Sequence, residues 1–100
     1  MIYHVVSRVA WELAVSKGFY EADYSLAAEG FIHLSTKEQV NGVLQRYYKG
    51  HTDLSLLHID ETKLIAELKY ELALSVNEMF PHLFGRLNID AVTNATIIKS

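Results

Sequence analysis

The stretch from residue 30 to residue 47, GFIHLSTKEQVNGVLQRY, predicts a short strand that runs directly into an amphipathic helix. Phe31 to Leu34 is apolar apart from one histidine, as in a buried strand. Ser35 and Glu38 match the S-x-x-E capping box, in which each side chain satisfies a backbone N–H at a helix start. Apolar residues then recur at helical spacing and predict one packed face: Val40, Val43, Leu44 and Tyr47.

The residues before this stretch predict a second strand and a second helix. Ile2 to Val6 is dense in β-branched and aromatic side chains, which favour strands. Ser7 can cap a helix that runs to about Lys17 and that Gly18 ends. Residues 19–30 predict an irregular loop with one helical turn, and loops of this length in compact domains are often functional.

The second half of the chain predicts strands. Leu54 to Ile59 reads as a buried strand, and the linker 60–63 is short enough for an antiparallel return. From Leu64 to Leu72 apolar and charged residues alternate, so one face of that strand meets water or a cleft. Residues 79–85 are apolar but interrupted by proline and glycine, which predicts a packed loop, and Ala91 to Ile98 predicts a last strand.

Length and composition predict one globular domain over residues 1–100, since half of the residues are hydrophobic, and the predicted order of strands and helices makes it an α+β domain. The formal charge of −3, with no run of like charges, argues against general nucleic-acid binding. The chain has no cysteine, which excludes disulfides, thiolate zinc sites and cysteine nucleophiles. Residues 1–18 resemble neither a signal peptide nor a membrane span, so we expect a cytoplasmic protein without a membrane partner.

His33 is the sharpest candidate for a functional side chain. It interrupts an apolar run, where an imidazole costs free energy unless a partner or ligand satisfies it. Alternation places His33 and Ser35 on one face, and the helix start at Ser35 favours an anion such as phosphate. The alternative is a histidine bonded to a neighbouring strand beside an ordinary helix cap.

The other candidates are three further polar positions near predicted strands. His4 lies in the first strand, Glu71 on the polar face of the alternating strand, and His82 beside Pro81 in the predicted loop. Each also has a structural interpretation: a cross-strand hydrogen bond for His4, a solvated face for Glu71 and a loop plug for His82. The two remaining histidines, His51 and His58, read as surface or core-edge residues.

Several segments together resemble the bacterial family of unknown function DUF952, over nearly the whole chain. The segments are Tyr3-His4, Trp11, the run GFIHLST at residues 30–36, Gln39-Val40, residues 57–60, Glu71, the run FPHLFG at residues 80–85, and Asp90-Ala91-Val92. The family has a proposed relationship to the ADP-ribosyltransferase fold, particularly to its RNA 2′-phosphotransferase branch. The resemblance therefore implies an α+β domain with a mixed, split β-sheet and two to three helices around an NAD-binding cleft.

The resemblance also implies roles for the candidate residues. Glu71, His33 and His82 would act in catalysis, with Glu71 stabilising positive charge on a ribose during transfer from NAD. His33 would also contact the ligand, together with His4, Ser35 and Thr36. No metal is expected.

Two other function classes remain open from the sequence. A non-catalytic nucleotide- or small-ligand-binding module would use the same histidines for orientation alone. A metal-dependent hydrolase would need His4, His33, His82 and Glu71 as ligands, but no H-E-x-x-H motif or close histidine pair occurs. Glycine-rich Rossmann and P-loop motifs are also absent from the sequence. The acceptor and the oligomeric state are not predicted.

Overall fold

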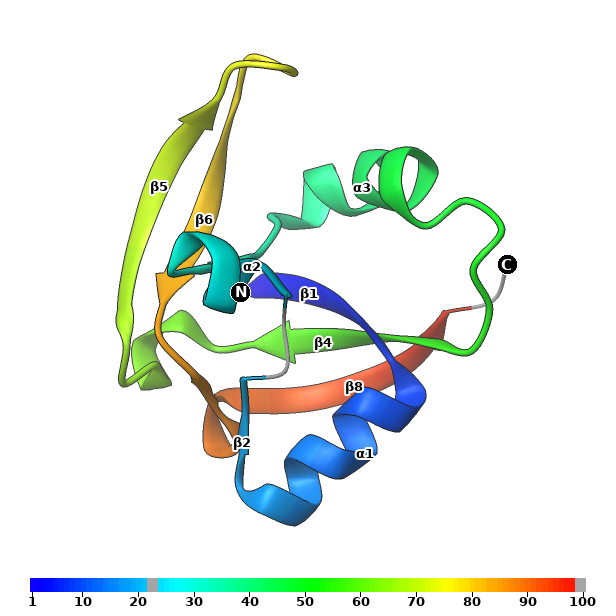
Figure 1. Cartoon of the computed structure of the whole chain (residues 1–100), viewed down its shortest axis with the longest axis vertical. Coiled ribbons are helices and arrows are strands. Elements are labelled where there is room, and N and C mark those ends of the chain that lie inside the picture. Colours follow the sequence, from blue (N-terminus) through cyan, green and yellow to red (C-terminus); the bar gives the residue numbers. More distant parts are fainter. Residues whose placement is uncertain (22–23, 99–100) are drawn as a thin grey trace.

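Two three-stranded sheets form the body of the protein, and the computed structural model describes residues 1–21 and 24–98 (Figure 1). The first sheet has the order β1 (Ile2–Ser7), β4 (Leu54–Ile59), β8 (Val92–Ile98), and the second β3 (Ile32–His33), β6 (Glu78–Phe84), β5 (Glu67–Ala73). A two-residue ladder joins β2 (Phe19–Tyr20) to β7 (Leu87–Asn88). Every ladder among the described residues is antiparallel. The α+β class is therefore confirmed, and the expectation of a mixed sheet is wrong.

Three α-helices accompany the sheets in the described part of the chain: α1 (Arg8–Lys17), α2 (Tyr24–Glu29) and α3 (Val40–Tyr47). The prediction for α1 is confirmed at both ends. Ser7 Oγ accepts a hydrogen bond from the Ala10 N–H at 3.1 Å, and Gly18 ends the helix in the left-handed conformation with φ of 96°. None of these helices is long and apolar enough to cross a membrane.

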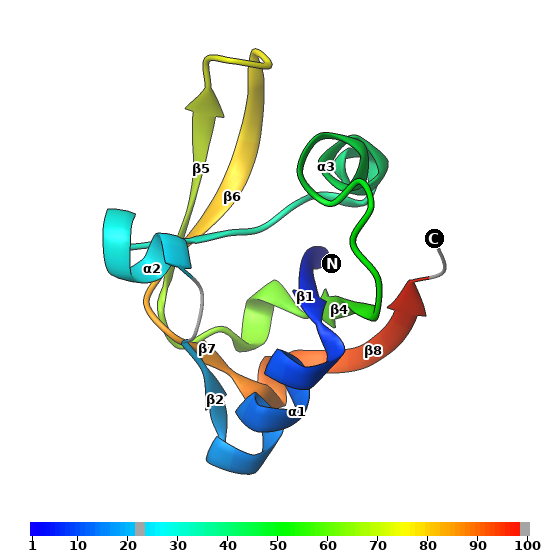
Figure 2. The same cartoon turned by 45° about the vertical axis from the view of Figure 1, so that its right-hand side comes forward.

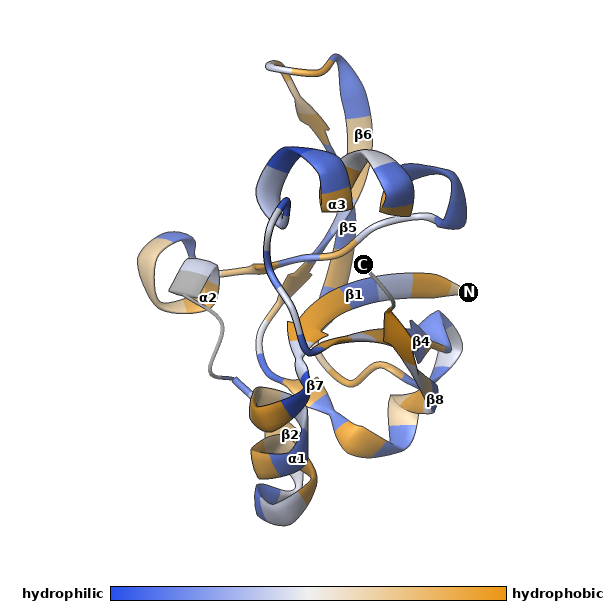
Figure 3. Cartoon of the chain, turned by 90° about the vertical axis from the view of Figure 1, so that its right-hand side faces the viewer, coloured by the Kyte–Doolittle hydropathy of each residue, from blue (hydrophilic) through white to orange (hydrophobic). Residues whose placement is uncertain are grey.

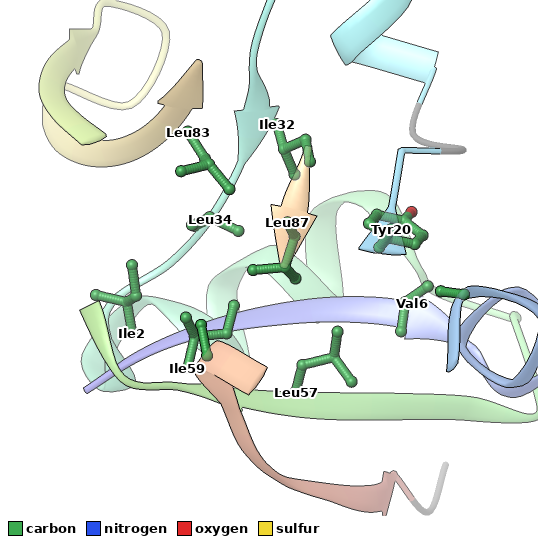
Figure 4. Packing of buried hydrophobic residues seen from close by; sticks show 11 residues of the cluster. Ile2, Val6, Tyr20, Ile32, Leu34, Leu57, Ile59, Leu83 and Leu87 are labelled. Atoms are coloured by element: carbon green, nitrogen blue, oxygen red, sulfur yellow. The ribbon is translucent and has the colours of Figure 1, made fainter. Parts of the chain in front are cut away.

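Among the described residues, one isolated backbone bridge joins the two large sheets. Tyr3 and Ser35 exchange N–H···O bonds of 2.8 Å in both directions, which ties β1 to the segment after β3 (Figure 2). Below this bridge the sheets share one hydrophobic core, in which Ile59, Ile32 and Leu83 are fully buried (Figure 4). The core fixes the two sheets relative to each other. On the side of the bridge away from the core, toward the top of Figure 1, the two sheets diverge.

The prediction of a packed loop at residues 79–85 is wrong, because this segment forms most of strand β6 (Glu78–Phe84). β6 pairs with β5 along seven residues and with β3 along two. Pro81 is tolerated at the point where β3 ends, and its carbonyl accepts a hydrogen bond from the Leu34 N–H at 2.9 Å. Gly85 is required after the strand, because a Cβ there would lie 2.8 Å from Ala66 Cβ.

Other local predictions are also corrected by the structure. The strand at 54–59 does not return to the alternating strand, because β4 pairs with β1 and β8 while β5 pairs with β6. The capping box lies one residue later than predicted, with the Gln39 side chain accepting from the Thr36 N–H at 3.0 Å. Residues 19–30 contain β2 and α2 rather than a single helical turn, and residues 22–23 lie outside the described part.

Candidate functional site

A cavity of about 760 Å³ lies between α3 and the hairpin of β5 and β6, within the size range of small-molecule sites. In Figures 1 and 2 the hairpin and α3 stand on opposite sides, with β1 beneath them. Val43 and Tyr47 line the cavity from α3, and Ala73 and Val76 line it from the hairpin. The divergence of the two sheets above their shared core thus leaves space for a ligand.

Four of the six predicted site residues line this cavity: His4, His33, Ser35 and His82. They come from β1, β3, the segment after β3, and β6, so the fold brings together residues that are far apart in the sequence. Glu71 does not line the cavity itself but bonds to His82. Thr36 is not among the lining residues.

His82 and Glu71 form a hydrogen-bonded pair at the hairpin side of the cavity. His82 Nδ1 donates to Glu71 Oε1 at 2.8 Å, because a carboxylate oxygen only accepts. His82 is buried, whereas the Glu71 side chain is 44% exposed. When the His82 ring is neutral, the carboxylate therefore fixes its proton on Nδ1 and leaves a lone pair on Nε2.

Two aromatic contacts hold the His82 ring in place. Phe31 stacks on it, with centroids 4.2 Å apart and an interplanar angle of 19°. His33 meets it edge to face at 5.0 Å. Packing on one side and a hydrogen bond on the other restrict this imidazole to one orientation.

His4 is buried on β1 and reaches across to β3. Its Nδ1 donates to the His33 carbonyl oxygen at 2.9 Å, since a carbonyl only accepts. When the ring is neutral, its Nε2 is therefore a hydrogen-bond acceptor. The structure confirms the cross-strand hydrogen bond that was the structural interpretation of His4, and it also places this histidine at the cavity.

His33 is half exposed, because alternation along β3 turns it away from the core that Ile32 enters. Its Nε2 lies 3.1 Å from Glu29 Oε1 at the end of α2. The apolar residues on either side of His33, Ile32 and Leu34, are therefore buried, while the imidazole itself lines the cavity surface. This arrangement needs no ligand for stability and leaves the ring accessible to one.

Two backbone donors beside the predicted anion site at the helix start are bonded within the protein. The Ser35 N–H bonds to the Tyr3 carbonyl, and the Thr36 N–H bonds to the Gln39 side chain. These two backbone donors are already satisfied within the protein. Ser35 is buried and lines the cavity, so its contribution to a ligand would come from its hydroxyl.

The wall formed by α3 was missed by the sequence analysis, which assigned Tyr47 to a packed face. Tyr47 is 62% exposed, and no described residue of α3 is fully buried. Figure 3 shows hydrophilic residues over the outer side of α3 and hydrophobic ones on the side toward β1. The amphipathic pattern was therefore recognised correctly, but its apolar stripe borders a cavity instead of a core.

The two remaining histidines differ in whether they line the cavity. His51 lines the cavity, with its ring 5.4 Å from that of Tyr48, so the interpretation of His51 as a plain surface residue is incomplete. His58 lies outside the cavity, 3.1 Å from Thr96 Oγ1, with its ring 5.1 Å from that of Tyr3. His58 thus makes contacts with Thr96 and Tyr3 that are separate from the cavity.

Apart from tyrosines, histidines are the only titratable side chains among the described residues that line the cavity. Among its described lining residues there is no lysine, arginine, aspartate or glutamate. Within residues 1–21 and 24–98, no group of three or more His, Cys, Asp or Glu side chains is placed to hold a metal ion. Among these described residues, His4, His33, His82 and Glu71 therefore do not form a group placed to hold a metal ion.

Comparison with known proteins identifies the family. The model of the family described as "Protein of unknown function (DUF952)" matches residues 5–95, and the chain belongs to this family. The crystal structure of protein CC0527 from Caulobacter crescentus is 34% identical, with a TM-score of 0.86 over 95% of this chain and 82% of that one. The solution NMR structure of CC0527 is 33% identical, with a TM-score of 0.84 over 98% and 84% of the two chains. No curated protein matches at a significant level.

Proposed function

We propose that this member of the DUF952 family binds NAD in the cavity between α3 and the β5–β6 hairpin and transfers its ADP-ribosyl group. The relationship to ADP-ribosyltransferases, including the phosphotransferase-like branch, is part of this proposal. Two antiparallel sheets that share a core and diverge around a cavity support it. A cytoplasmic location is also part of the proposal and agrees with a chain that has no cysteine.

The pair of His82 and Glu71 is the observation that carries the proposal. A buried imidazole with a carboxylate on Nδ1 and a lone pair on Nε2 is the arrangement that general bases use, because the carboxylate stabilises the imidazolium formed on protonation. The carboxylate of the pair lies at the surface, since the Glu71 side chain is 44% exposed on the hairpin. The pair adjoins His33 and the cavity.

In ADP-ribosyl transfer, nicotinamide leaves C1′ of the ribose with the bonding electrons, and the acceptor's nucleophilic atom then bonds to C1′. His82 Nε2 takes the proton that the acceptor loses. Glu71 stabilises the resulting imidazolium, so it acts through His82 as a positioning residue. His33 and His4 orient ribose hydroxyls or the nicotinamide amide by hydrogen bonding.

The residues fit one half of NAD better than the other. Histidine rings and the Ser35 hydroxyl match the hydroxyl and amide groups of the nicotinamide riboside half, and Tyr47 offers an aromatic surface. The pyrophosphate meets no lysine or arginine among the described lining residues. We therefore place the nicotinamide half against the histidines and leave the pyrophosphate at the solvent side.

A non-catalytic binding module is the second candidate, and one observation favours it. Glu71 bonds to His82 without lining the cavity, so no described carboxylate lines the cavity to stabilise a positively charged ribose directly. A module of this kind binds a nucleotide or another small ligand through the same histidines without breaking a bond. The two candidates differ in nicotinamide release and agree on binding.

His33→Ala tests the proposed ligand contact. We expect a loss of less than about 1 kcal/mol in unfolding free energy, because the side chain is half exposed and its pairing with Glu29 is on the surface. We expect NAD affinity to fall about tenfold, the effect of one lost hydrogen bond. Urea denaturation and calorimetric titration with NAD measure the two quantities.

His58→Ala is the matched control for His33→Ala, because His58 lies outside the cavity. This control is expected to retain the NAD affinity of the wild type. An unchanged affinity in His33→Ala, or a loss of several kcal/mol in its stability, contradicts a ligand role for His33.

A further inference from the structure

The outer edge of β5 has no strand partner within the described residues. β5 is the last strand of the sheet β3-β6-β5, and its ladder to β6 uses only one of its edges. In Figure 1 the hairpin projects from the body, with β5 along its outer side. An open edge of seven residues presents backbone donors and acceptors that another strand can pair with.

The direction of these backbone groups follows from the hydrogen bonds of the sheet. The Pro81 carbonyl points to β3, where it accepts from Leu34, so Phe80 and His82 point their backbone groups to β5. Their partners on β5 are Glu71 and Lys69. The alternate residues of β5 therefore direct their N–H and C=O groups to the open edge: Leu68, Tyr70 and Leu72.

The open edge also carries apolar side chains that the protein leaves in water. Tyr70 is 44% exposed and Leu72 is 50% exposed. The Tyr70 hydroxyl donates to Glu61 Oε2 at 3.0 Å, which holds the ring on this face. Partial burial, reinforced by that hydrogen bond, raises the pKa of Tyr70, so its hydroxyl stays protonated at neutral pH.

The charges of β5 select one self-pairing register. Antiparallel pairing of two β5 strands centred on Tyr70 uses all seven residues and places Lys69 of each copy opposite Glu71 of the other. It also places Leu68 opposite Leu72 on the apolar face. A register centred on Lys69 would bring lysine against lysine and glutamate against glutamate, which is unfavourable.

We propose that β5 is a homodimerisation strand, through which two copies of this chain pair edge to edge about a two-fold axis at Tyr70. The partner is a second copy because the strand is complementary to itself in both charge and apolar pattern. The two sheets then become one continuous sheet. Lys69 of the second copy comes beside Glu71, the carboxylate that holds His82, so the interface adjoins the candidate site.

Sedimentation of charge variants over a concentration series tests the proposal. The wild type is expected to dimerise as concentration rises. Lys69→Glu and Glu71→Lys each place like charges opposite each other twice, and are each expected to raise the dimer dissociation constant at least about tenfold. The double variant Lys69→Glu/Glu71→Lys restores opposite charges and is expected to dimerise again.

Lys37→Glu is the matched control, because it makes the same charge change at an exposed position outside β5 and is expected to dimerise like the wild type. Circular dichroism confirms that each variant is folded. A wild type that stays monomeric at every concentration overturns the proposal. Single variants that dimerise with the same dissociation constant as the wild type, or a folded double variant that does not dimerise, overturn it as well.

Discussion

Glu71→Gln is expected to lower nicotinamide release from NAD by about a hundredfold to a thousandfold, the scale of losing one preorganised electrostatic contact. Glutamine retains an oxygen that accepts from His82 Nδ1, so the ring keeps its orientation and tautomer. The lost negative charge no longer stabilises the imidazolium. Because that charge matters mainly in the transition state, NAD affinity is expected to stay within a few-fold of the wild type.

Nicotinamide formation and calorimetric NAD affinity, measured with candidate acceptors present, test this expectation. Glu67→Gln is the matched control, because Glu67 lies on the same face of β5 but pairs with Lys69 instead of His82. It is expected to keep both rate and affinity. Equal rates in Glu71→Gln and the wild type contradict the role of Glu71, and binding without any nicotinamide release in the wild type favours the non-catalytic module.

Leu83→Ala is expected to destabilise the protein by about 2–5 kcal/mol, since it leaves a cavity in a packed core. Leu83 is 0% exposed on β6, where it pairs with Ile32 of β3 and Leu68 of β5. The loss tests whether residues 79–85 form a central strand, because a leucine in a surface loop contributes far less. Urea denaturation followed by circular dichroism measures the change.

Leu74→Ala is the control for Leu83→Ala, because Leu74 lies in the hairpin turn and is 84% exposed. It is expected to change the unfolding free energy by less than about 0.5 kcal/mol. A small effect of Leu83→Ala, similar to that of the control, contradicts the packing of β6 between β3 and β5.

Local sequence signals were sufficient to predict the ends of a helix, because these depend on side chains and backbone conformations within one turn. Ser7 and Gly18 bound α1 as predicted, because a side-chain cap and a left-handed glycine act within one turn. The prediction for β6 was wrong because a proline usually interrupts a strand. Pro81 is tolerated here because β3 ends beside it, and the sequence around Pro81 does not show where a distant strand ends. The pairing of β5 with β6 instead of β4 is likewise decided by the shared core and not by linker length.

The sequence predicted which residues belong to the candidate site but not which of them contact one another. The histidines of β1, β3 and β6 converge because alternation within each strand sets which face they occupy. The hydrogen bond that His82 donates to Glu71 depends on the register of the β5–β6 ladder, which no local pattern reveals. Tyr47 was misplaced for a related reason: helical periodicity identifies an apolar face but not whether a core or a cavity lies against it.

The most direct test of the central claim is an NMR titration with NAD that follows the imidazole nitrogens of all five histidines. His4, His33 and His82 line the cavity and His58 does not, so the protein contains its own internal control. The account predicts saturable shifts of the His4, His33 and His82 ring signals, and none for His58. Ring signals of His33 and His82 that stay unchanged at millimolar NAD would contradict it.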